Sequence, residues 1–419
     1  MIALGVLAAM LFILTAPTPP QLVTGDRASI HKMAITYDEA SWDPVTAWAT
    51  QHLGMMSVHQ QAQSVLMLHF AGADAGALRA AIDTYQPGGI IVMADNVSGS
   101  VDELSGLLAQ LQVDPELPLL TGIDEEGGIV TRLTEDTYPS AETLRNLPVT
   151  ATLDAFSARG QLLTAAGANT NFGVVADMTA DPQSFIYDRS FGGEPAPTAE
   201  RVAAAVTGEK PFVNSTIKHF PGHGAAPGDS HVGIPTTGMS LAEWQATAAI
   251  PFAAGIDAGA KLVMFGHLAY TAVDSLPASL SPTWHDILRR DLGFHGVAIT
   301  DDMLMLQHSG VAEFADPVNN AVKALTAGND VLLYVLAANP ELNGTATENL
   351  AQGIEDAVTR GELSAERLKD AALRALVLRR SLAPGAHAML PPCERVCPAF
   401  FPQTRQWSSD VTGVMAPAE

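Results

Sequence analysis

The stretch GVAITDD (residues 296–302) shows the pattern that decides this fold, because a short apolar, β-branched run ends there in two acids. Continuous apolar runs of this length are typical of strands buried on both faces. Eight such runs, separated by segments long enough for a crossover helix, predict an α/β fold, a (β/α)8 TIM-like barrel with a single catalytic domain. The seven other runs are SVLMLHF (64–70), GIIVMAD (89–95), PLLTGID (118–124), NTNFGVV (169–175), NSTIKHF (214–220), KLVMFGH (261–267) and DVLLYVL (330–336).

Polar side chains gather at the carboxyl ends of these runs. Asp124, Lys218, His219, His267 and Asp301 all lie at such ends, although they are far apart in the chain. The carboxyl ends of barrel strands converge on one face, and that face carries the active site in enzymes of this architecture. We therefore predict the functional site there.

A last helix is predicted over residues 363–382, with Ser364 as its N-cap. Its core-facing stripe would comprise Leu368, Ala371, Ala372, Ala375 and Leu376. Beyond it the chain becomes rich in proline. We divide the chain into a leader and linker (1–35), the catalytic barrel (36–383) and a proline-rich C-terminal tail (384–419).

The N-terminus is apolar from Ile2 to Leu14. The run is shorter than the ~20 residues of a membrane span, but it suits the core of a signal peptide. We expect a secreted or cell-envelope protein. No Lys or Arg precedes the run and no clean small-x-small cleavage site follows, so a cytoplasmic protein with a mis-set start codon is the alternative.

Two features of the composition bear on partners. The formal net charge is −23, which repels phosphate backbones, so we expect no nucleic-acid partner. The two cysteines, Cys393 and Cys397, form either a small disulfide ring or free thiols, and with no histidine nearby they make a poor zinc site.

Two loops after strands carry candidate binding residues. In TGIDEEGGIVTRL (121–133), Asp124 closes a strand and could accept hydrogen bonds from sugar hydroxyls, with Arg132 on the same rim; the alternative is a set of solvated acids. In FIYDRSFGG (185–193), Arg189 offers a fork for an oxygen-rich ligand, unless the segment is only a surface loop.

Of the two acids that end GVAITDD, only one can point inward, because adjacent side chains on an extended strand face opposite ways. We expect Asp301 to be that residue. A carboxylate in this position has the chemistry for nucleophilic attack or for metal ligation.

The stretch IKHFPGHGAAPGDSHVGIP (217–235) has three interpretations. Its histidines could be polar surface of a long loop. In a metal-dependent hydrolase, His219, His223, His231 and Asp229 would surround a divalent ion, although the expected His-x-His pair is absent. Otherwise Lys218 and His219 bind a polar ligand, and His231, held by Asp229, transfers protons near neutral pH.

Several ordered motifs resemble glycoside hydrolase family 3, within it the bacterial β-N-acetylhexosaminidase subgroup. KHFPGHG followed by DSH, together with DEEGG and TDDM, carries the resemblance. It extends over roughly residues 60–382 through GGIIVMADN (88–96), YDRSFGG (187–193) and the long stretch from Leu276 to Met303.

The resemblance implies a retaining exo-β-N-acetylglucosaminidase acting on cell-wall-derived glycosides. Asp301 would be the nucleophile and would form a glycosyl–enzyme intermediate, while His231 with Asp229 would act as acid and then base. Terminal N-acetylglucosamine would be bound by the strand-end and loop residues Asp124, Arg132, Arg189, Lys218 and His219. The resemblance implies no metal, no cofactor and no obligate protein partner; the partner is a small carbohydrate substrate.

Other functions remain open from the sequence. A neutral histidine base would not repel phosphate, so a phosphorolytic variant is one alternative and a β-glucosidase variant another. A metal-dependent barrel hydrolase would lose its activity in excess EDTA. A non-catalytic sugar-binding protein is disfavoured, because it would need neither Asp301 nor the pair His231 and Asp229.

Overall fold

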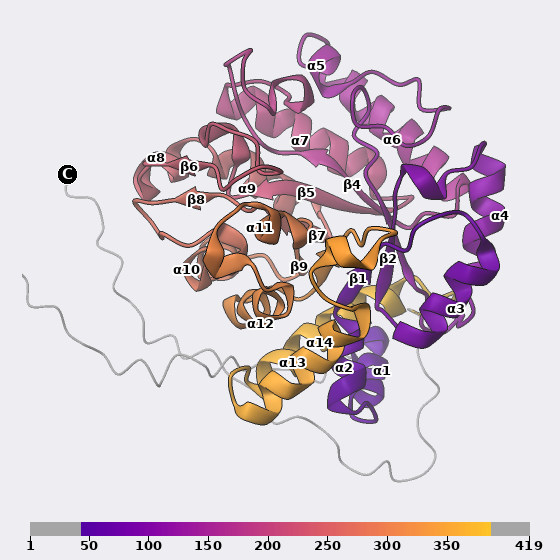
Figure 1. Ribbon diagram of the computed structural model, residues 1–419. Helices are drawn as coiled ribbons and strands as arrows, with labels where there is room; N and C mark the ends of the chain where they lie inside the picture. Colours follow the sequence, from indigo (N-terminus) through magenta and orange to yellow (C-terminus); the bar gives the residue numbers. More distant parts are fainter. Residues whose placement is uncertain (1–42, 387–419) are drawn as a thin grey trace, which may run out of the picture. The chain divides into compact units, whose positions relative to one another are not determined.

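The computed structural model describes residues 43–386 (Figure 1). The predicted leader, both cysteines and all but the first three residues of the predicted tail lie outside the described residues. Within the described part of the chain, no helix is both long enough and apolar enough to cross a bilayer.

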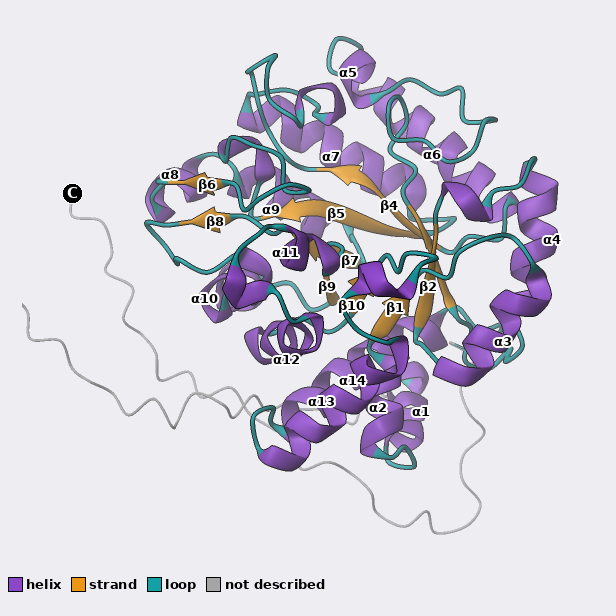
Figure 2. Cartoon of the chain, in the orientation of Figure 1, coloured by secondary structure: helices purple, strands orange, loops and turns teal. Residues whose placement is uncertain are grey.

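Eight parallel strands form the centre of the fold, in the order β10-β1-β2-β3-β4-β5-β7-β9 (Figure 2). A parallel bridge between Ile299 and Val331 brings the two ends of this sheet together, so the barrel is nearly closed. The predicted (β/α)8 barrel is confirmed. The strands are β1 (Leu66–Leu68), β2 (Gly89–Val92), β3 (Leu120–Ile123), β4 (Thr170–Val175), β5 (Asn214–Phe220), β7 (Leu262–Phe265), β9 (Val297–Thr300) and β10 (Leu332–Tyr334).

All eight strands lie within the predicted apolar runs, and every residue in them is buried. One face of each strand packs into the barrel, where Met67, Phe172 and Met264 meet. The other face packs against helices, as Phe220 does with Phe252 of α9. Burial on both faces explains why the runs are continuous rather than alternating.

Helices surround the sheet, as Figure 2 shows. The predicted last helix is confirmed as α14: Ser364 Oγ accepts from the backbone N–H of Arg367, and the predicted apolar stripe is buried. The helices are α1 (Pro44–Leu53), α2 (Val58–Ser64), α3 (Ala75–Tyr85), α4 (Val101–Leu111), α5 (Ala141–Leu144), α6 (Val149–Ala165), α7 (Pro195–Glu209), α8 (Leu241–Ala246), α9 (Ala249–Ala258), α10 (Pro282–Asp286), α11 (Leu304–His308), α12 (Pro317–Ala327), α13 (Thr347–Arg360) and α14 (Ala365–Ser381).

A small parallel sheet, not predicted from the sequence, joins two loops on the carboxyl side of the barrel. It pairs β6 (Thr236–Thr237) with β8 (Ala269–Tyr270). The backbone N–H of Ala269 also donates to the carbonyl of Pro235 at 2.9 Å. The far end of the loop after β5 is therefore fixed to the loop after β7.

A buried acid at the amino end of β10 holds three arginines. The Asp330 carboxylate lies 2.5 Å from Arg289, 2.8 Å from Arg367 and 3.8 Å from Arg374. Burial alone would raise the pKa of Asp330, but the three guanidinium groups outweigh it and keep the pKa below its usual value. This cluster ties α14 to the opposite end of the barrel from the predicted site.

Candidate active site

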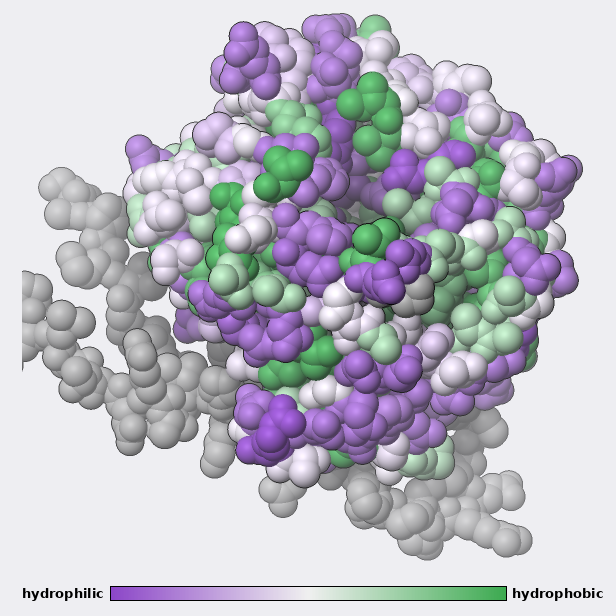
Figure 3. All heavy atoms as spheres, viewed as in Figure 1, coloured by the Kyte–Doolittle hydropathy of each residue, from purple (hydrophilic) through white to green (hydrophobic). Residues whose placement is uncertain are grey.

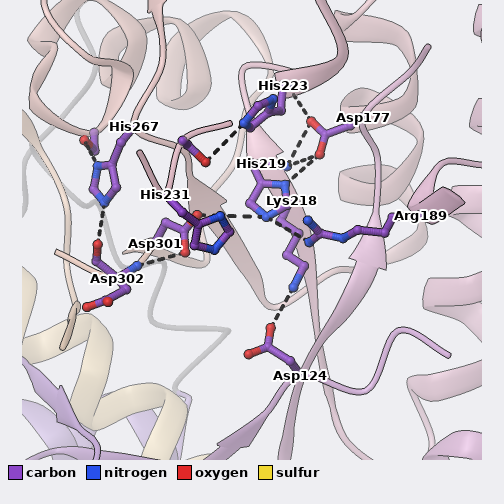
Figure 4. A network of polar contacts seen from close by, with 12 residues as sticks. Asp124, Asp177, Arg189, Lys218, His219, His223, His231, His267, Asp301 and Asp302 are labelled. Carbon is purple, nitrogen blue, oxygen red and sulfur yellow. Dashed lines mark hydrogen bonds and ion pairs between the residues drawn. The ribbon is translucent and has the colours of Figure 1, made fainter. Parts of the chain in front are cut away.

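Side chains from the ends of β3, β5 and β9 meet on the carboxyl face of the barrel (Figure 4). Lys218 Nζ lies 2.7 Å from Asp124 Oδ1, and His219 Nε2 lies 3.9 Å from Asp301 Oδ2. The parallel register of the strands causes this convergence, because it brings their carboxyl ends to one level. The structure thus brings four of the predicted site residues together.

An ion-pair cluster of alternating sign forms one side of the site. Lys218 Nζ contacts both Asp124 and Glu126 at 2.7 Å. Arg189 donates to both oxygens of Glu126, at 2.7 and 2.8 Å. Arg132 lies 3.6 Å from Asp124. Every cation that we predicted to bind sugar therefore already has a carboxylate partner, and Arg189 uses its fork to hold Glu126.

The charges in this cluster are stabilised mutually rather than by water. Burial alone would raise the pKa of Glu126, but Arg189 and Lys218 outweigh it and hold the pKa at about 2. Burial would likewise lower the pKa of Lys218, but Asp124 and Glu126 keep it above its usual value. Both groups are therefore charged at neutral pH, and their side chains are preorganised.

Asp177 is a site residue that the sequence analysis missed. It is fully buried just after β4, and it accepts from the backbone N–H groups of His219 and His223 and from the ring of His219 at 2.6 Å. Since a carboxylate only accepts hydrogen bonds, Nδ1 of His219 carries a hydrogen and Nε2 faces Asp301. The position of Asp177, two residues past a predicted strand, was a signal that could have revealed it.

The two acids after β9 have different surroundings. Asp301 faces His219, and its Oδ1 accepts from the N–H of Asp302 at 2.8 Å. Burial alone would raise the pKa of Asp301, but His219, the N–H of Asp302 and other groups outweigh it and hold the pKa below its usual value. Asp302 instead accepts from the N–H groups of Leu304 and Val335, and burial raises its pKa to about 7. Of the two acids, Asp301 is therefore the one whose carboxylate faces His219.

His267 holds the backbone at this strand end. It is buried, its Nδ1 lies 2.7 Å from Ser279 Oγ, and its Nε2 lies 2.9 Å from the carbonyl of Asp302. Because a carbonyl only accepts, Nε2 carries a hydrogen and Nδ1 accepts from the serine in the neutral ring. Burial lowers the pKa of His267 and favours that neutral form.

The predicted proton-transfer pair lies on the loop after β5. His231 Nδ1 lies 2.7 Å from Asp229 Oδ1, with the His231 side chain 60% exposed and Asp229 36% exposed. The ring of Phe185 packs edge-on at 5.5 Å from His231. Among the interactions of the described residues, none joins this pair directly to Asp301, although the charge of His231 acts on the neighbouring Asp302.

His223 stabilises the loop between His219 and His231. Its Nε2 lies 3.1 Å from Ser230 Oγ, and its backbone N–H donates to Asp177. Burial lowers its pKa, which favours the neutral ring. The donors of the metal alternative are thus engaged in separate hydrogen bonds, and within residues 43–386 no group of three or more His, Cys, Asp or Glu has the arrangement of a metal site.

Large apolar side chains are also exposed on the loops that surround the site. Ile129, Phe185 and Val232 lie on the loops after β3, β4 and β5. Figure 3 shows hydrophobic residues standing among hydrophilic ones over one face of the molecule. These loops therefore offer apolar as well as polar contacts to a ligand.

Residues 51–378 match the glycosyl hydrolase family 3 N-terminal domain, and the chain belongs to this family. It is 36% identical over 266 residues to a β-hexosaminidase of Nitrosospira multiformis, an alignment that covers 61% of this chain and 74% of the relative. It is 30% identical over 334 residues to β-hexosaminidase A of Pseudoalteromonas piscicida, covering 72% of this chain and 54% of the relative.

The fold is similar to that of solved members of the family. A glycoside hydrolase family 3 β-N-acetylglucosaminidase from Paenibacillus sp. str. FPU-7 has a TM-score of 0.71 and 30% identity, over 82% of this chain and 66% of that one. LpqI of M tuberculosis has a TM-score of 0.69 and 27% identity, over 84% of this chain and 98% of that one. The chain thus spans about half to three quarters of the curated relatives described above and nearly all of LpqI.

Proposed function

We propose that this chain is a retaining exo-β-N-acetylglucosaminidase that removes terminal N-acetylglucosamine from cell-wall-derived glycosides. Membership of family 3 and the relatives named β-hexosaminidase support a glycosidase of this class. The observation that carries the mechanism is the position of the Asp301 carboxylate beside His219, where three strand ends meet and neighbouring groups hold its pKa below the usual value. A partly buried carboxylate kept ionised at a strand end is equipped for attack on an electrophilic carbon.

In the first step, an oxygen of Asp301 forms a bond to the anomeric carbon as the bond from that carbon to the leaving oxygen breaks. His231 gives its proton to the leaving oxygen, and Asp229 stabilises the charged imidazolium before this transfer. The products of the step are the free aglycone alcohol and a glycosyl ester on Asp301.

In the second step, water attacks the same carbon and the ester bond to Asp301 breaks. The neutral His231 accepts a proton from that water, which restores the starting charges of both residues. Two displacements at one carbon return the original configuration, as in retaining enzymes that use two carboxylates. An imidazole replaces the second carboxyl group here.

The sugar would be bound by the ion-pair cluster. Lys218, Arg132 and Arg189 are fixed by carboxylates, so their remaining N–H donors and the free carboxylate lone pairs are preorganised for hydroxyl and amide groups. Sugar recognition then needs little rearrangement of these side chains. The metal-dependent alternative receives no support from the arrangement of histidines or from the named relatives.

A panel of p-nitrophenyl β-glycosides tests the proposal. We expect cleavage of the N-acetylglucosaminide at a kcat/KM at least about tenfold above those of the glucoside and xyloside, in the presence of excess EDTA. Comparable or higher rates on the glucoside would contradict the proposed specificity. Formation of N-acetylglucosamine 1-phosphate in phosphate buffer would instead identify a phosphorolytic enzyme.

A further inference from the structure

Glu125 lies between two site acids, Asp124 and Glu126, but its side chain points into the protein. It is fully buried, and its Oε2 accepts from the backbone N–H groups of Arg132 and Leu133 at 3.0 and 3.2 Å. The side chain thus connects the end of β3 to residues 132–133 of the loop that follows it. The side chain of Arg132 lies beside Asp124 in the site.

The backbone of Glu125 is fixed separately. Asn171 of β4 accepts from the N–H of Glu125 at 3.1 Å and donates to its carbonyl at 3.0 Å. The same Asn171 amide donates to the buried carboxyl group of Glu209 on α7. Asn171 of β4 therefore holds the backbone of Glu125, whereas the side chain of Glu125 holds the loop after β3.

The second carboxyl oxygen of Glu125 is unsatisfied unless it carries a proton. Oε1 is buried and has no donor partner, while the carboxyl group of Asp136 lies within hydrogen-bonding reach. Arg159 of α6 donates to Asp136 through Nε and Nη2, and both of these side chains are fully buried. Because the Arg159 cation pairs with Asp136 and not with Glu125, the proton of the acid pair is assigned to Glu125.

The electrostatic surroundings agree with that assignment. Burial, and then the neighbouring Asp136, raise the pKa of Glu125 to about 8, against the lowering effect of the Arg132 and Leu133 N–H groups. Glu209, a further buried acid, accepts from Asn171, and burial raises its pKa to about 7. A protonated Glu125 is therefore the form present at neutral pH.

We propose that Glu125 is a positioning residue whose O–H donates to Asp136 while its other oxygen holds the Arg132–Leu133 backbone, so that one buried proton keeps the sugar-binding loop in place. The inference rests on the proposed function, because it assigns Arg132 to the sugar. Loss of that proton to solvent leaves two carboxylates in contact. Their repulsion weakens the hold on the loop.

The experiment compares the pH dependence of KM and kcat in the wild type and in Glu125→Gln. In the wild type we expect KM for the N-acetylglucosaminide to rise about tenfold between pH 7 and pH 9.5, with a smaller change in kcat. The amide of the variant donates to Asp136 and accepts from both N–H groups at every pH, so its KM should stay level. Glu209→Gln is the matched control, since it removes a buried acid that does not touch the loop, and it should keep the wild-type profile.

A second measurement separates this inference from the proposed function. Hydrogen exchange at the Arg132 and Leu133 amides, corrected for intrinsic pH dependence, should lose protection between pH 7 and pH 9.5 in the wild type but not in Glu125→Gln. This readout decides the matter even if the chain cleaves no N-acetylglucosaminide, and the wild-type arm suffices if the variant fails to fold. Unchanged protection in the wild type, or a KM rise that persists in Glu125→Gln, overturns the proposal.

Discussion

The Nε2 atom of His219 lies 3.9 Å from Oδ2 of Asp301, which joins the ends of β5 and β9, two strands that β7 separates in the sheet. Asp177 fixes the other side of the His219 ring and so determines which nitrogen faces Asp301. This arrangement keeps a carboxylate ionised in a place where burial alone would favour its neutral form.

Replacement of Asp301 by asparagine removes the nucleophile but keeps the size of the side chain. We expect kcat to fall by about a thousandfold or more, because the glycosyl ester cannot form. Binding of N-acetylglucosamine, measured by calorimetry, should remain detectable because the ion-pair cluster is intact. Retention of more than about a tenth of the wild-type kcat would contradict the assignment.

Replacement of His231 by alanine separates its role as an acid from its other roles. On natural glycosides we expect a loss of about 10²- to 10⁴-fold in kcat/KM. On a dinitrophenyl glycoside, whose leaving group needs no proton, formation of the glycosyl ester should be impaired much less. Asp229→Asn should show a weaker form of the same selectivity. Equal losses on the two substrates would argue against proton donation by His231.

Asp177→Ala should destabilise the protein as well as the site, because His219 and His223 lose a shared acceptor. We expect a decrease of about 3–5 kcal/mol in the free energy of unfolding, measured in urea. The folded-state pKa of Asp177 is below its usual value of 3.8, so its contribution to stability is present above that value and is lost on further acidification. The wild type should therefore lose more stability than the variant below about pH 4; parallel curves would disprove this contribution.

Asp330→Asn provides the structural counterpart, because it disrupts a buried cluster far from the site. Three arginines lose their shared charge partner, and we expect a decrease of about 3–5 kcal/mol in the free energy of unfolding. The kcat/KM of the folded variant, measured well below its melting temperature, should stay within about twofold of the wild-type value. A large change in kcat/KM with unchanged stability would show that this cluster serves the site.

The barrel was predictable because its strands are buried on both faces and most of them therefore leave a nearly continuous apolar run. The last helix was predictable for a related reason, since Ser364 and the apolar stripe after it follow rules of local spacing. The short sheet of β6 and β8 was not, because two residues per strand carry no periodic signal. Its pairing depends on tertiary contacts between two loops.

Part of the site was predictable because its residues directly follow buried strands. Asp124, Lys218, His219 and Asp301 stand at strand ends, where topology dictates that they meet. The ion-pair partners are harder to predict, because the sequence does not distinguish Glu126 from a solvated acid. Only the fold brings Arg189 and Lys218 into contact with it. Arg132 and Arg189 lie beside Asp124 and Glu126, but these carboxylate partners could not be read from spacing alone.

The exposed position of His231 has a consequence for how such an enzyme can diversify. The residues proposed to bind the sugar lie at strand ends and on the loops after β3 and β4, whereas the proposed proton carrier lies on the loop after β5, which is anchored at its far end by β6 and β8. Insertions or exchanges within that loop could retune the response to different leaving groups without disturbing the residues proposed to bind the sugar. Recognition of the sugar and choice of the aglycone would in this sense depend on different segments of the chain.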